Sequence, residues 1–161
     1  LIDNENLRWL EEPVIADDID GYADLKASCR TPISGGEHEY TLFGFRQLLE
    51  KKAIDVVQFD TNRVGGITQA HKISALAEAF QIPVIPHAGQ VHNFHISMSS
   101  VNAPIVEYFP FWPVEIGNEL FWYIFDGEPQ AKNGFIELDE NKHGLGIKLS
   151  NKYLDKFEII D

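Results

Sequence analysis

The sequence predicts an α/β fold, namely part of a TIM-type (β/α) barrel. Short apolar runs alternate with amphipathic stretches between residues 7 and 107, a pattern typical of repeated βα units around a parallel sheet. A polar or ionisable residue closes every apolar run. In barrels of this kind the chemistry gathers at the carboxyl ends of the strands, so we expect these closing residues to share one site.

The first two units each end in an acid. Residues 7–10 form an apolar run before Glu11, and residues 18–25 then predict a capped helix with acids in its first turn. The second run, residues 31–36, ends at Glu37. Apolar residues at helical spacing predict the helix that follows it: Leu42, Phe45, Leu48 and Leu49.

The third unit has the same form. Residues 54–59 make an apolar run that ends at Asp60. Gly65 and Gly66 then permit a tight turn and open another helix. The apolar stripe of that helix consists of Ile73, Leu76, Ala77 and Phe80.

Two further runs complete the alternation, for five predicted strands in total. Residues 82–86 end at His87, and residues 103–106 end at Glu107. Beyond Glu107 the chain is rich in aromatic and turn residues, and the alternation stops. A barrel needs eight strands and about 250 residues, so we expect five strands alone to be an incomplete and poorly folded unit with exposed edges.

Composition excludes several classes of protein. The chain has 44% hydrophobic and 24% charged residues, the balance of a soluble globular domain. A net charge of -12 argues against nucleic-acid binding, and no apolar run is long enough to span a membrane. The single cysteine, Cys29, excludes an internal disulfide and fits a cytoplasmic location. The first residue is Leu, so we expect a fragment or a processed product.

Paired strand-end acids suggest a magnesium site. Glu11 and Glu37 would point toward the same end of a parallel sheet, and Mg²⁺ prefers carboxylate and water oxygens. Glu12 is an alternative to Glu11, and both acids have the competing interpretation of helix caps or surface charges. The histidines His92 and His95 lack the spacing of a transition-metal chelate.

Asp60 and His87 suggest proton transfer, because they end successive strands. A carboxylate that hydrogen-bonds one imidazole nitrogen fixes the tautomer and raises the basicity of the other nitrogen. The competing interpretation is an exposed aspartate and a histidine buried in a loop. The sequence has no glycine-rich phosphate loop and no Gly-x-Ser-x-Gly motif, so nucleotide binding and serine hydrolysis have little support.

The order of these motifs resembles the mandelate racemase subgroup of the enolase superfamily. The resemblance covers nearly the whole chain and rests on residues 9–13, 34–37, 58–60, 65–68 and 85–87. Residues 36–40, 60–72 and 86–90 are similar, more narrowly, to the L-rhamnonate dehydratase branch. The resemblance implies that residues 1–108 are the C-terminal half of the barrel. Residues 109–161 would be a C-terminal tail that completes the barrel and packs on a capping domain.

The resemblance also implies roles for single residues. Glu11 and Glu37 match the second and third ligands of a magnesium ion, and the first ligand and the capping domain would lie before Leu1. Asp60 and His87 match the catalytic dyad, and Glu107 matches an acid that contacts the substrate carboxylate. His38 is similar to a substrate-binding residue of the rhamnonate branch.

The implied activity is Mg²⁺-dependent dehydration of an acid sugar, most narrowly of L-rhamnonate to its 2-keto-3-deoxy product. The complete enzyme would act on a small molecule as a homo-oligomer, without nucleic acid or membrane. Two alternatives remain open: dehydration or epimerisation of another acid sugar, and an inactive fragment that only binds a partner or ligand.

Overall fold

Three parallel strands form the centre of the fold, as the computed structural model shows for residues 2–110 and 122–154. The sheet order is β1 (Leu10–Glu11), β2 (Ile33–Gly35) and β3 (Val56–Val57). Leu10 is paired with Ile33, and Ser34 is paired with Val56. A short 3-10 helix, η1 (Ile2–Asn4), precedes the sheet. The predicted α/β fold with a parallel sheet is confirmed.

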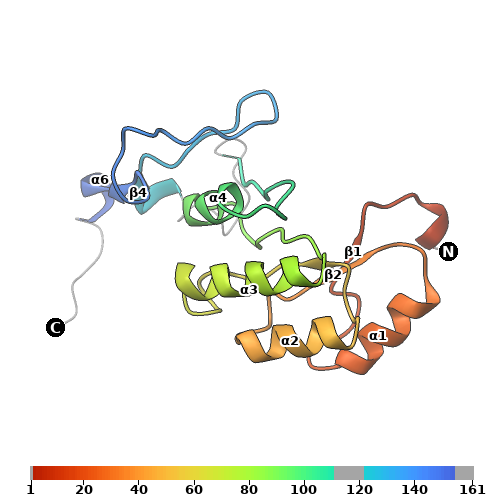
Figure 1. Ribbon diagram of the computed structural model, residues 1–161. Helices are drawn as coiled ribbons and strands as arrows, with labels where there is room; N and C mark the ends of the chain where they lie inside the picture. The colour runs from red at the N-terminus through yellow and green to blue at the C-terminus, as the bar shows by residue number, and fades with distance from the viewer. Residues whose placement is uncertain (1, 111–121, 155–161) are drawn as a thin grey trace.

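Helices connect the strands in chain order (Figure 1). After β1 comes α1 (Ile19–Ser28), whose N-cap Asp18 accepts a hydrogen bond from the Gly21 backbone. After β2 comes α2 (Leu42–Glu50), which Thr41 caps in the same way. After β3 comes α3 (Ile67–Ala79), which packs against α2 and against α4 (Val91–Met98). Each βα crossover therefore returns the chain to the start of the next parallel strand.

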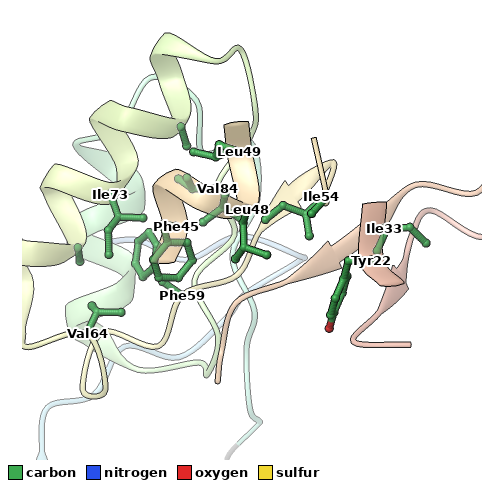
Figure 2. Close-up of a cluster of buried hydrophobic side chains, with 14 of the residues drawn as sticks. Tyr22, Ile33, Phe45, Leu48, Leu49, Ile54, Phe59, Val64, Ile73 and Val84 are labelled. Atoms are coloured by element: carbon green, nitrogen blue, oxygen red, sulfur yellow. The ribbon is translucent and has the colours of Figure 1, made fainter. Parts of the chain in front are cut away.

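The hydrophobic core lies between the sheet and these helices (Figure 2). Phe45 of α2 meets Phe59 edge to face, with ring centroids 6.4 Å apart and an interplanar angle of 87°. Such aromatic pairs add to the stabilisation that burial of the rings gives. The labelled members of the core are Tyr22, Ile33, Phe45, Leu48, Leu49, Ile54, Phe59, Val64, Ile73 and Val84.

The last two predicted strands differ from expectation. Residues 82–86 contribute a single bridge, between Val84 and Val57, and residues 103–106 form no strand in the described part of the chain. The prediction of a fifth strand is therefore wrong. Proline explains the weak pairing, because Pro83, Pro86 and Pro104 have no backbone N–H to donate.

The C-terminal segment lies beside α4 (Figure 1). Its strands β4 (Phe125–Asp126) and β5 (Lys148–Leu149) pair antiparallel, and a short helix, α6 (Asn151–Leu154), follows. Part of the predicted tail, residues 111–121 and 155–161, lies outside the described residues. Over residues 2–110 and 122–154, no helix has the length and apolar character to cross a membrane.

Glu128 makes the attachment of this segment sensitive to pH. Its Oε2 accepts the Val91 N–H at 3.2 Å, at the start of α4. Burial raises the pKa of Glu128 from 4.5 to about 7, so the folded state holds a proton that the unfolded chain releases at lower pH. This contribution to stability is complete below pH 4.5 and is lost as the pH rises toward 7.

We therefore expect Glu128→Gln to flatten the dependence of the melting temperature on pH between about 4.5 and 7. The amide keeps an oxygen that can accept from Val91 but cannot ionise. Thermal unfolding of the complete protein at several pH values measures the effect. Glu140→Gln is the control, since Glu140 is exposed, and equal pH profiles for the wild type and Glu128→Gln would contradict the prediction.

Candidate active site

Acidic and imidazole side chains meet at the carboxyl end of the sheet. Glu11 is the last residue of β1, and Glu37 follows the end of β2 by two residues. Asp60 follows β3, and His87 follows the bridge residue Val84. Because these strands run parallel, their following loops lie at the same end.

His87 lies between two carboxylates. Its Nδ1 is 3.1 Å from Asp60 Oδ2, and its Nε2 is 3.3 Å from Glu37 Oε2. The backbone N–H of His87 also donates to the Phe59 carbonyl at 3.0 Å, which fixes the two strand ends side by side. Three of the sequence-predicted residues are therefore in direct contact. Their chemical roles stay predictions.

The contact with Asp60 shifts the pKa of both partners. Burial raises the pKa of Asp60, but hydrogen bonds from His87 and from the backbone N–H groups of Asn62 and Arg63 outweigh it, so the pKa is lowered. The hydrogen bond to Asp60 raises the pKa of His87, against the opposing effect of burial. An ionised Asp60 accepts a hydrogen bond from the Nδ1–H group of His87, which leaves Nε2 as the nitrogen that can take a proton. We call Asp60 and His87 the dyad.

Glu11 and Glu12 point to different partners. Glu11 Oε2 accepts from Gln58 Nε2 at 2.9 Å. Glu12 Oε2 lies 2.5 Å from His38 Nδ1, and His38 Nε2 lies 3.6 Å from Glu37 Oε1. Within the described ranges, the one group of three residues whose ligand atoms all lie within 4.8 Å is Glu12, Glu37 and His38. This group contains Glu12 and not Glu11, and both acids remain candidate ligands.

These donors fit a hard divalent cation. Carboxylate oxygens are the ligands that Mg²⁺ prefers. Gln58 adds a second indication, because its Oε1 is buried without a hydrogen-bond partner while its Nε2 is held by Glu11. A buried acceptor of this kind suits a donor such as a water bound to a cation. Glu11 already accepts from Gln58, whereas Glu12 is occupied by His38 and by the Gly36 N–H, so we retain Glu11 as the predicted ligand.

Glu107 lies near the dyad. Its Oε2 accepts the Ala88 N–H at 2.6 Å. Close packing of Gly89 holds the two loops together, since a Cβ there would lie 2.6 Å from the Cα of Tyr108. Burial raises the pKa of Glu107, and the negative charges of Glu11 and Glu37 add to the shift. Glu107 is therefore protonated more readily than an exposed glutamate.

The backbone turns sharply beside the predicted residues. Glu12 and Ala88 have φ values of 39° and 73°, in the left-handed region that non-glycine residues seldom adopt. Gly36, just before Glu37, has φ 124°, and a Cβ there would lie 2.6 Å from the Phe45 ring. Only glycine fits this position. Packing of Gly36 against the core therefore fixes the position of the backbone just before Glu37.

Three residues of the site were missed by the sequence reasoning. Gln58 contacts Glu11. The sequence could have indicated Gln58, because it is a polar residue inside an apolar run. Arg63 contacts Glu37 and Asp60. Asn93 Nδ2 donates to the carbonyls of His87 and Ala88, at 2.6 Å each, while its Oδ1 accepts from Thr61. The sequence offered no indication of the contact between Asn93 and Thr61, because these residues are 32 positions apart in the chain.

Comparisons with known proteins show the family of the chain. Residues 1–153 match the family described as enolase C-terminal domain-like. L-rhamnonate dehydratase of Saccharopolyspora erythraea is 38% identical over 149 residues, which is 90% of this chain and 38% of that protein. The chain therefore spans well under half the length of this relative.

Solved structures show the same relationship. The L-rhamnonate dehydratase from Gibberella zeae has a TM-score of 0.82 and 34% identity, over 94% of this chain and 39% of its own. The L-talarate dehydratase from Polaromonas sp. JS666, solved with Mg and L-glucarate, has a TM-score of 0.83 and 30% identity, over 96% of this chain and 40% of its own.

Proposed function

Because the chain belongs to the enolase C-terminal domain-like family, we propose that it carries part of the active site of a Mg²⁺-dependent acid-sugar dehydratase. The proposed substrate is L-rhamnonate, and the product is its 2-keto-3-deoxy acid. The observation that carries the proposal is the position of His87, with Nδ1 on Asp60 and Nε2 3.3 Å from Glu37. A base beside a predicted metal ligand suits removal of a proton next to a carboxylate.

The dyad performs the proton transfers in this proposal. His87 Nε2 takes the proton from C2, while Asp60 stabilises the imidazolium that forms. Protonated His87 then returns the proton to the C3 hydroxyl, which leaves as water, and the enol product tautomerises to the keto acid. Magnesium, held by Glu11 and Glu37, would supply positive charge that stabilises the substrate carboxylate as its negative charge increases.

Glu107 and His38 bind the substrate in this proposal. The raised pKa of Glu107 favours a protonated carboxyl, which can donate a hydrogen bond to the substrate carboxylate. His38 is half exposed, and Glu12 holds its ring. A ring held in this way can contact a sugar hydroxyl with little loss of conformational freedom.

A second candidate is dehydration or epimerisation of a different acid sugar by the same dyad. The structural match to an L-talarate dehydratase favours this candidate. In either case a binding-only role is disfavoured by the carboxylate-supported imidazole at the strand ends.

An assay of the complete protein tests the proposal. Incubation with a library of aldonic and aldaric acids and MgCl₂ should yield a 2-keto-3-deoxy acid, detected as its semicarbazone. EDTA should abolish the reaction, and added Mg²⁺ should restore it. We expect the 161-residue chain alone to be inactive, because its described sheet remains open. A complete protein that forms no keto acid from any member of the library would overturn the proposal.

A further inference from the structure

A single arginine joins the two halves of the candidate site. The Nη1 atom of Arg63 is 2.7 Å from the backbone oxygen of Glu37 and 3.1 Å from Glu37 Oε1. Its Nε is 3.6 Å from Asp60 Oδ2. One guanidinium therefore contacts both the predicted metal ligand and the carboxylate of the dyad.

The backbone of Arg63 is anchored at the same place. Its N–H donates to the Asp60 carbonyl at 3.0 Å and lies 3.3 Å from Asp60 Oδ1. Arg63 thus lies in a turn that begins at Asp60, and its guanidinium contacts Glu37. Its side chain is 34% exposed, against 18% for Glu37 and 10% for Asp60. Partial burial reduces the screening of these ion pairs by solvent.

Charge explains why an arginine is needed here. Glu37 and Asp60 are two carboxylates that share the ring of His87, and their negative charges repel each other. Among the Lys and Arg side chains that the structure describes, only Arg63 forms an ion pair with Glu11, Glu37, Asp60 or Glu107. Arginine keeps its charge at every working pH, and its planar guanidinium presents its N–H donors in a fixed fork, whereas a lysine ammonium is a compact point charge.

We propose that Arg63 is a positioning residue that holds Glu37 at a fixed place relative to the dyad, so that metal binding and proton abstraction depend on it together. This inference rests on the proposed function for its catalytic half. Arg63 engages Oε1 of Glu37 and leaves Oε2 on the side of His87. Loss of the guanidinium frees the Glu37 side chain and leaves two uncompensated carboxylates beside His87.

The test compares Arg63→Met, Arg63→Lys and the control Arg46→Met in the complete protein. Arg46 pairs with Glu50 on the exposed face of α2, away from the site. Mn²⁺ binding is measured by electron paramagnetic resonance, alongside kcat, KM and the melting temperature. We expect Arg63→Met to weaken Mn²⁺ binding by about 10- to 100-fold and to lower kcat more than it raises KM. Arg63→Lys should recover part of both losses, and Arg46→Met should match the wild type.

The metal measurement separates this inference from the proposed function. If the wild type is inert toward every acid sugar, the proposed function fails, while weaker Mn²⁺ binding in Arg63→Met still supports the positioning role. Unchanged Mn²⁺ affinity in a folded Arg63→Met protein overturns that role. If Arg63→Met does not fold, Arg63→Lys provides the test instead. Wild-type Mn²⁺ affinity and wild-type kcat in Arg63→Lys would show that the planar guanidinium is not needed, which would overturn the positioning role.

Discussion

Replacement of His87 by Asn should abolish exchange of the substrate C2 proton with solvent in the complete enzyme. Asn is smaller and still able to hydrogen-bond Asp60, but it has no nitrogen that accepts a proton near neutral pH. Loss of a general base typically lowers a rate by about 10²- to 10⁴-fold, and in the proposed mechanism His87 serves both proton transfers. Proton NMR in deuterium oxide measures the exchange directly, independently of product formation.

The control for this change is His71→Asn. His71 is exposed on α3, so its replacement should leave exchange unchanged. Mn²⁺ binding by His87→Asn should also persist, because the predicted ligands remain. Undiminished exchange in His87→Asn would remove His87 from the mechanism.

Glu37→Gln should weaken metal binding by about 100-fold or more. The amide has nearly the same shape, but it lacks the negative charge that a hard cation requires. It also removes the negative charge that faces Arg63 and His87. Since changes to the groups around a metal ligand already cost about 10- to 100-fold in affinity, loss of the ligand charge itself should cost at least as much. Isothermal titration with MgCl₂ measures the affinity.

Glu50→Gln is the matched control, because Glu50 pairs with Arg46 on the exposed face of α2. It should bind Mg²⁺ as the wild type does. If Glu37→Gln also binds Mg²⁺ normally, Glu37 is not a ligand. Glu12 would then be the next candidate, given its place in the Glu12, Glu37 and His38 group.

Local signals predicted much of the fold. The expected helix over residues 18–25 is α1, capped by Asp18 as its sequence suggested. The stripe that begins after Gly66 is α3, with Ile73 and Ala77 buried. Residues 103–106 failed as a strand, because an apolar run indicates burial but not hydrogen-bond partners, and Pro104 removes a donor.

The sequence predicted where the candidate site lies in the fold, but it did not predict which side chains contact one another there. Strand-end placement alone brought Glu37, Asp60 and His87 together, because parallel strands share one carboxyl end. Glu11 and Glu12 have different partners, Gln58 and His38, at a turn where Glu12 has φ 39°. The contacts of Arg63 with Glu37 and of Asn93 with Thr61 join residues 26 and 32 positions apart, so no local pattern could reveal them.

Asn93 also has a consequence for anyone who redesigns this protein. Its buried amide holds Thr61 on one side and the His87 and Ala88 carbonyls on the other. Asn93 therefore links the loop at residues 60–64 to the loop at residues 86–90, and substitutions in the two loops should show non-additive effects. Grafting a new loop from a relative at residues 60–64 should succeed only when residues 86–90 are exchanged from the same donor.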